Sequence, residues 1–285
     1  VVRKVNSRSF SAGLEAELDV SEARGRAFTS AGAIEEAVAG GGSGPDGWVV
    51  KAEHGNAALG NRRIRGPSLD DADRRFIDNA LAGDDRVVLE KWHERETDMT
   101  AVFHLTPAGE LKDFRVHEAV YTSDGALIGV VFAGEIVSWK EKLAGHAESV
   151  AAALAREGYF GPVCFDAYTF REGGGTRLRP LADLNCRRAM SDGAHRLWRE
   201  RFGDSTFYWR FFTVDKLVHH AAAELKASDM ALRAGQRHGV LLTSPWRIEV
   251  DGRTEAIPKL GVAFIGETRA EVLAMEAGFR ERWEK

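Results

Sequence analysis

Two carboxylates and an amide lie where a hairpin can bring them together. Asp166 lies in one β-rich run, and Asp183 and Asn185 lie at the end of the next, with three consecutive glycines between the runs. Two such runs predict a β-hairpin, and because residues i and i+2 share a strand face, Asp183 and Asn185 project together, with Asp166 able to join them. Such oxygen ligands suit Mg²⁺, which water and substrate phosphates usually complete. The alternative is a polar sheet edge, but the apolar neighbours Phe165 and Leu184 favour a half-buried face, where clustered acids are costly without a cation.

Arg187 follows Asn185 by two residues and shares its face if the strand continues. An arginine in this position can clamp a transferring phosphoryl group or an anionic intermediate. Most of the other arginines nearby are typical of a solvated surface. Arg187 is the one that we predict to act in catalysis.

A lysine and a small-residue loop form a second candidate site. Lys51 closes a short apolar strand, and the small residues Gly55, Ala57, Ala58 and Gly60 follow it. Small side chains let backbone N–H groups approach phosphate oxygens, while the lysine neutralises their charge. The segment is no Walker A box, because it lacks Gly-Lys-Ser/Thr. The alternative is a surface loop with incidental glycines.

A third candidate is the strand end Glu90-Lys91-Trp92, with Asp98 further along. Backbone groups at a strand end can bind adenine and an aromatic ring can stack on it, while Asp98 can accept hydrogen bonds from ribose hydroxyls. For a lone instance, an exposed strand end with a half-buried tryptophan is the commoner alternative.

Composition excludes several classes of protein. The 285 residues are 44% hydrophobic and 29% charged, which is ordinary for a globular protein. The net charge of −4 leaves no chain-wide basic excess for a nucleic acid, so binding one would need a local basic patch. Two cysteines exclude a disulfide framework and a four-thiolate zinc site. The apolar stretches are too short to cross a bilayer, and residues from Val1 onward do not show a charged segment followed by an apolar one, the pattern of a signal peptide. We therefore expect a cytoplasmic protein without nucleic-acid or membrane partners.

Local patterns predict strands interleaved with helices, which is typical of an α+β fold. The chain opens abruptly on a predicted strand, so we expect that a segment precedes Val1 in the full protein. Ser9 or Ser11 is the expected cap of the first helix. The expected helices are 14–18, 31–39, 70–81, 140–157, 215–225 and one from 268; the expected strands are 1–5, 48–51, 86–90, 101–105, 114–117, 127–132, 163–168, 178–184 and 239–243, with a loop over 55–66.

Taken in order, these motifs resemble the ATP-grasp superfamily over about residues 1–200. Lys51 and the loop to Gly60 resemble its lysine and phosphate-covering loop. The segment from Glu90 to Asp98 resembles the adenine hinge and ribose acid of D-alanine–D-alanine ligases, with a spacing one residue longer and Asp where Glu is usual. Asp166, Asp183 and Asn185 match the magnesium ligands, with Asp183 again shorter than the usual Glu, and Arg187 matches the arginine of biotin carboxylase-like members. Cys164 stands where D-alanine ligases carry an arginine.

The resemblance implies an ATP-grasp α+β fold in which two subdomains, 1–89 and 90–204, grip Mg-ATP between them, with a C-terminal α/β extension over 205–285. It implies an ATP-dependent ligase that activates a carboxylate as an acylphosphate for attack by an amine or a thiol, on small-molecule or peptide substrates. The alternatives are a kinase-like member that phosphorylates a hydroxyl group and a nucleotide-binding module without turnover. For assembly, a homodimer and a missing upstream domain or partner chain are both open.

Overall fold

A computed structural model describes residues 1–19, 21, 23–41, 47–55, 60–122, 125–133, 137–218, 220–245, 247–250 and 253–285. The chain forms two compact units: residues 1–116, 124–126 and 137–189 make up the first, and residues 117–123, 127–136 and 190–285 the second. Every candidate site residue belongs to the first unit. These units do not test the expected subdomains 1–89, 90–204 and 205–285, which stay a prediction.

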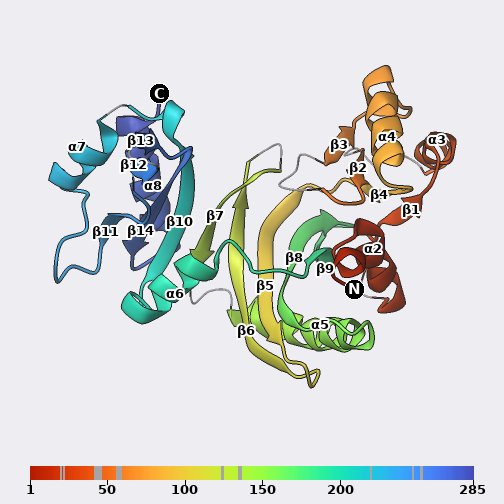
Figure 1. Ribbon diagram of the computed structural model, residues 1–285, viewed down its shortest axis with the longest axis horizontal. Coiled ribbons are helices and arrows are strands. Elements are labelled where there is room, and N and C mark those ends of the chain that lie inside the picture. Colours follow the sequence, from red (N-terminus) through yellow and green to blue (C-terminus); the bar gives the residue numbers. More distant parts are fainter. Residues whose placement is uncertain are drawn as a thin grey trace. The chain divides into compact units, whose positions relative to one another are not determined.

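The first unit contains a small four-stranded antiparallel sheet (Figure 1). Its strand order is β1 (Arg26–Phe28), β4 (Val87–Lys91), β2 (Trp48–Ala52) and β3 (Asn61–Ile64). Helices α3 (Ala31–Gly40) and α4 (Asp71–Gly83) pack their apolar faces on it. The Ser30 side chain caps α3, and Asp70 and Asp73 form a capping box at the start of α4. The expected helices and strands are confirmed here, except that the expected 55–66 loop contains β3.

A larger antiparallel sheet carries the hairpin. Its order in the first unit is β6 (Leu111–Tyr121, of which 117–121 belong to the second unit), β5 (Arg95–Leu105), β8 (Gly161–Glu172) and β9 (Gly175–Asn185). Gly173 and Gly174 take positive φ angles of 58° and 79°, the left-handed conformation that the β8–β9 turn needs. Helix α5 (Val137–Arg156) packs against one face and buries Phe165 and Leu184 there. The predicted hairpin is confirmed.

The expected opening strand is wrong. Residues Val2–Val5 form the short helix α1, whose Val5 is fully buried in the same core as α5. A five-residue segment with three valines does not distinguish a strand from a helix, and tertiary burial overrides the β preference of valine. Helix α2 (Arg8–Glu17) follows, and Ser7, rather than Ser9 or Ser11, caps it by accepting a hydrogen bond from the Phe10 amide.

The second unit is an antiparallel sheet with helices (Figure 1). Its strand order is β11 (Gly239–Leu242), β14 (Lys259–Gly266), β10 (Thr206–Thr213), β7 (Leu127–Phe132) and the end of β6. The other elements are α6 (Asp192–Arg201), α7 (Ala221–Ala227), α8 (Arg269–Trp283) and the ribbon of β12 (Arg247–Val250) and β13 (Arg253–Ala256). The expected 215–225 helix is instead a 3₁₀ turn, η2 (Val214–Lys216), followed by α7. No helix in the described part of the chain is long and apolar enough to span a bilayer.

Candidate functional site

The sheet face opposite α5 carries the predicted hairpin residues in rows across β5, β8 and β9. Directly paired residues in an antiparallel sheet share a face. Thr100, Asp166 and Asp183 form the middle row. Asp98, Tyr168 and Arg179 form the row on one side, and Val102, Cys164 and Asn185 form the row on the other. The structure therefore brings the three predicted metal ligands together.

Hydrogen bonds hold the side chains of the middle row. The Thr100 hydroxyl donates to Asp166 Oδ1 at 2.8 Å, and the Asn185 amide donates to Asp183 Oδ2 at 3.2 Å. Arg187 donates to Asn185 Oδ1 at 3.1 Å, so the predicted catalytic arginine lies beside this group although β9 has ended. Arg187 is itself exposed, which leaves its guanidinium accessible to a substrate.

The carboxylates of this face lie among cations. The guanidinium of Arg8, from α2, forms an ion pair with Asp183, and Arg95 pairs with Asp98 at 2.8 Å. Burial raises the pKa of Asp166, and the Thr100 hydrogen bond and the nearby positive charges (Arg8, Arg95 and Lys51) only partly offset it. A group whose ionised form is disfavoured in this way is suited to a further cation.

Lys51 reaches this face from the small sheet. Its ammonium pairs with Glu90 Oε1 at 2.7 Å and donates to the Ala182 carbonyl oxygen at 3.3 Å, next to Asp183 in the chain. Burial lowers the pKa of Lys51 to about 8, which the negative charge of Glu90 only partly counters. The structure thus places the predicted phosphate lysine beside the hairpin.

The residues of the predicted adenine hinge point in different directions. The Glu90 carboxylate points into the protein, where it pairs with Lys51 and with Arg179, and these charges lower its pKa to about 2 against the effect of burial. Lys91 is exposed, and the Trp92 amide donates to the Gly47 carbonyl oxygen at 3.0 Å. The Trp92 ring lies 4.3 Å from the Arg63 guanidinium and 6.0 Å from that of Arg95. Adenine binding here stays a prediction.

The predicted phosphate loop is partly visible. Gly55 and Gly60 lie so close that a Cβ on Gly60 would come within 2.8 Å of the Gly55 Cα atom. The Ala52 amide donates to the Gly60 carbonyl oxygen at 2.7 Å, which closes the base of the loop. Ala57 and Ala58 lie outside the described residues.

The donor set fits Mg²⁺ by its chemistry. Two carboxylates and one amide oxygen are hard ligands on one face, and the metal leaves its other positions to water and phosphate oxygens. Among the described residues, no group of three or more His, Cys, Asp or Glu side chains could hold a metal ion. The predicted set has only two such members, so its third protein ligand is an amide.

Some functional candidates are absent from the sequence prediction. Arg8 occupies the first turn of α2, where the helix dipole disfavours a cation, and this is a signal that it has a partner elsewhere. Thr100 lies two residues after Asp98 and so shares its strand face. Arg179 and its partner Glu15 offer no comparable local signal, because they are 164 residues apart in the chain.

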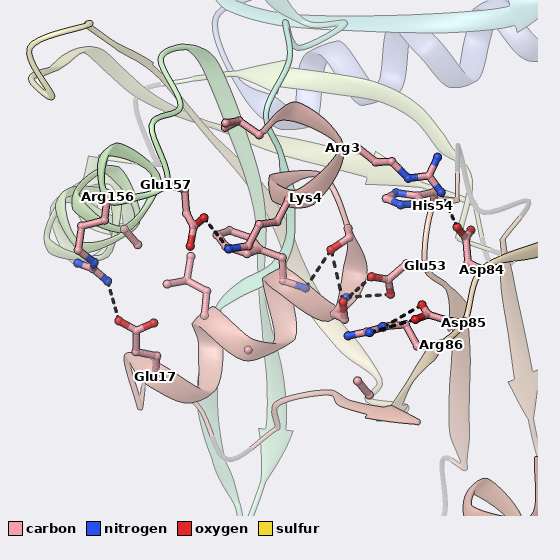
Figure 2. A pocket seen from close by; sticks show the side chains of 18 residues that line it. Arg3, Lys4, Glu17, Glu53, His54, Asp84, Asp85, Arg86, Arg156 and Glu157 are labelled. Carbon is pink, nitrogen blue, oxygen red and sulfur yellow. Dashed lines mark hydrogen bonds and ion pairs between the residues drawn. The ribbon is translucent and has the colours of Figure 1, made fainter. Parts of the chain in front are cut away.

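A cavity of about 980 Å³ lies elsewhere in the first unit, between α1, α2, the end of α5 and the 84–86 segment (Figure 2). Four ion pairs lie among the charged residues that line it: Arg3 with Asp84, Lys4 with Glu157, Arg86 with Asp85 and Arg156 with Glu17. None of the predicted site residues in the described part of the chain lines it. The rows of the hairpin are therefore the better candidate site.

Comparisons with known proteins bear on the fold. No protein-family model and no curated protein matches the chain. Among solved structures, N5-carboxyaminoimidazole synthase from Aspergillus clavatus, with ADP and 5-aminoimidazole ribonucleotide, is 14% identical; the match covers 99% of this chain and 74% of that one, with a TM-score of 0.60. Biotin carboxylase from Campylobacter jejuni, in an ATP complex, is 13% identical; the match covers 98% of this chain and 66% of that one, with a TM-score of 0.62.

A third similar structure is the biotin carboxylase domain of Hydrogenobacter thermophilus 2-oxoglutarate carboxylase, with MgADP and bicarbonate. It is 12% identical, and the match covers 99% of this chain and 66% of that one at a TM-score of 0.63. At such identities the likeness establishes the fold. With its antiparallel sheets, its helices and these neighbours, the chain has the α+β ATP-grasp fold that the order of its motifs predicts.

Proposed function

We propose that this protein binds Mg-ATP on the hairpin face and uses it to activate a carboxylate as an acylphosphate, which an amine or a thiol then attacks. The observation that carries the proposal is the middle row, where Asp166 and Asp183 lie opposite each other with Asn185 bonded to Asp183 and Lys51 nearby. The nucleotides in the similar solved structures support it.

Each residue has a physical task in this scheme. Asp166, Asp183 and Asn185 hold Mg²⁺, which when bound neutralises phosphate charge. An ammonium has three N–H donors; Glu90 and Ala182 account for two of those of Lys51 among the described residues. In this scheme the third donates to phosphate. The exposed guanidinium of Arg187 stabilises negative charge on the transferred phosphoryl group.

Arg8 also has a task in this scheme. Its guanidinium, at the start of α2, pairs with Asp183 and so lies beside the residues that would hold the metal ion. There its positive charge would add to that of the metal ion in binding the phosphates.

The test is ADP formation in the presence of hydroxylamine, which traps an acylphosphate as a hydroxamate. The chain is incubated with Mg-ATP and a panel of carboxylic acids, with bicarbonate included because one similar structure holds it. We expect acid-dependent ADP and hydroxamate, both reduced at least about 100-fold in Arg187→Met, since removing a donor to a developing negative charge has that effect. Binding of MgADP, measured by calorimetry, should be nearly unchanged in the same variant.

Other outcomes select the alternatives. ADP together with a stable phosphorylated alcohol, without any need for an amine, indicates a kinase. Tight binding of MgADP without turnover on any acid indicates a nucleotide-binding module. Failure to bind MgADP at all contradicts the proposal. Cytoplasmic location, the substrates and any oligomeric assembly stay predictions.

A further inference from the structure

A continuous chain of buried ion pairs runs from α2 to Lys51. Glu15, on α2, accepts two hydrogen bonds from Arg179 on β9, both of 2.8 Å. The same guanidinium donates to Glu90 Oε2 at 2.6 Å, and the other Glu90 oxygen pairs with Lys51 at 2.7 Å. Arg179 also donates to the Tyr168 hydroxyl at 3.3 Å. Two carboxylates and two cations therefore alternate over four elements.

These groups are almost completely shielded from water. The side chains of Glu15 and Arg179 are each 1% exposed, and those of Glu90 and Lys51 are 6% and 8% exposed. Buried ion pairs are weak contributors to stability, because removing charges from water offsets their attraction, and well-packed apolar residues often do as well. Stability alone therefore gives a poor reason for four buried charges in a row.

Helix α2 connects this chain of ion pairs to the middle row. Arg8 and Glu15 are seven residues apart, which is about two helical turns, so they share one face of α2. Arg8 pairs with Asp183 and Glu15 pairs with Arg179, so both side chains contact charges of β9. The helix thus contacts two charged residues of β9, Asp183 in the middle row and Arg179 in the neighbouring row.

We propose that Glu15 and Arg179 are positioning residues for phosphate binding: Glu15 fixes Arg179, Arg179 fixes Glu90, and Glu90 holds the Lys51 ammonium toward the hairpin face. This inference rests on the proposed function. The planar fork of arginine suits the task, because one guanidinium can bind two carboxylates in fixed directions. When Glu15 loses its charge, Arg179 relies on Glu90 alone, which draws that carboxylate away from Lys51.

The experiment compares Glu15→Gln with wild type by calorimetric titration with MgADP and, separately, with adenosine. We expect the affinity for MgADP to fall about tenfold, the lower end of what the loss of a partner behind a binding residue costs, while adenosine affinity stays unchanged. Arg179→Lys keeps the positive charge but loses the planar fork of the guanidinium. It should also lower the ratio of MgADP affinity to adenosine affinity. The matched control is Glu276→Gln, which removes the buried partner of Arg210 in the second unit and should leave the ratio unaltered.

A second readout needs no nucleotide. The acylation rate of Lys51 by acetic anhydride, followed by peptide mass spectrometry, should rise several-fold in Glu15→Gln and stay constant in Glu276→Gln, because only the former releases the ammonium from Glu90. If wild type binds MgADP and Glu15→Gln changes neither the ligand ratio nor the acylation rate, the positioning role is overturned and the proposed function stands. If wild type binds no MgADP, the proposed function itself has failed, whatever the acylation rate.

Discussion

Replacing Lys51 with methionine tests the phosphate site most directly. Methionine approximates the aliphatic stem of lysine and removes the ammonium. A hydrogen bond to a charged group contributes about 1.5–3 kcal/mol, which corresponds to a loss of roughly 10- to 150-fold in affinity for MgADP. Adenosine has no phosphate, so its affinity should not change.

The same substitution should not destabilise the protein much. Lys51 has a pKa of about 8 in the folded chain, against an ordinary value of 10.5, so keeping it charged at neutral pH costs about 3 kcal/mol. Methionine removes that cost. Glu90 loses one partner but keeps Arg179, 2.6 Å away. We therefore expect a melting temperature equal to that of wild type or higher, together with weaker phosphate binding.

The pH dependence has a definite sign. Lys51 carries its charge below a pKa of about 8, so wild-type affinity for MgADP should be full below that pH and should fall as the pH rises through it. Between about pH 8 and pH 10.5 the side chain of Lys51 binds more protons in the unfolded chain than in the folded one. The contribution of Lys51 to stability therefore rises with pH in that window. In Lys51→Met we expect neither the loss of MgADP affinity at high pH nor the rise in stability that Lys51 causes. The nucleotide titrates equally with both proteins, so its own protonation cancels when wild type is compared with the variant.

The assay is calorimetric titration of wild type and Lys51→Met with MgADP and adenosine at several pH values between 7 and 9.5, with melting curves at each pH. Equal losses of affinity for the two ligands would contradict phosphate recognition by Lys51. An identical pH profile in wild type and variant would refute the argument that burial brings this lysine near neutrality.

Other predictions concern the metal, the core and the loop base. Asp183→Asn should reduce the Mg²⁺ dependence of ADP binding at least about tenfold, because a neutral amide is a weaker ligand; titration of ADP with and without Mg²⁺ checks this. Phe165→Ala should lower the free energy of unfolding, measured by urea titration, by about 3–5 kcal/mol, because Phe165 is fully buried. Phe160 is 61% exposed, so Phe160→Ala should change that free energy by less than about 0.5 kcal/mol. Gly60→Ala should weaken MgADP binding several-fold without affecting adenosine, because its Cβ would come within 2.8 Å of Gly55.

Local sequence patterns were sufficient for much of the candidate site. The alternation of apolar and polar residues and the glycines between the two runs specify the hairpin, and its geometry places Asp183 and Asn185 on one face. Cross-strand pairing then puts Asp166 opposite Asp183. These relations are short in sequence and depend on strand geometry, which is why they could be predicted.

Other features were beyond local patterns. The run Val1–Val5 has the composition of a strand, yet burial of Val5 against the core favours a helix. Glu90 reads as an exposed hinge acid, whereas its side chain is an internal ion partner of Arg179. Burial and partner choice depend on segments that are distant in the chain, and no window of neighbouring residues contains that information.

The sequence by itself determined the α+β class and the hairpin, because both follow from periodicity and turn residues. The order of its motifs carries the resemblance to the ATP-grasp superfamily. Tertiary structure alone decided that Arg8 pairs with Asp183 and that Glu15 reaches Lys51 through Arg179 and Glu90. Those contacts form only when α2 docks on β9, where exclusion of water makes each buried charge depend on an opposite charge from another element.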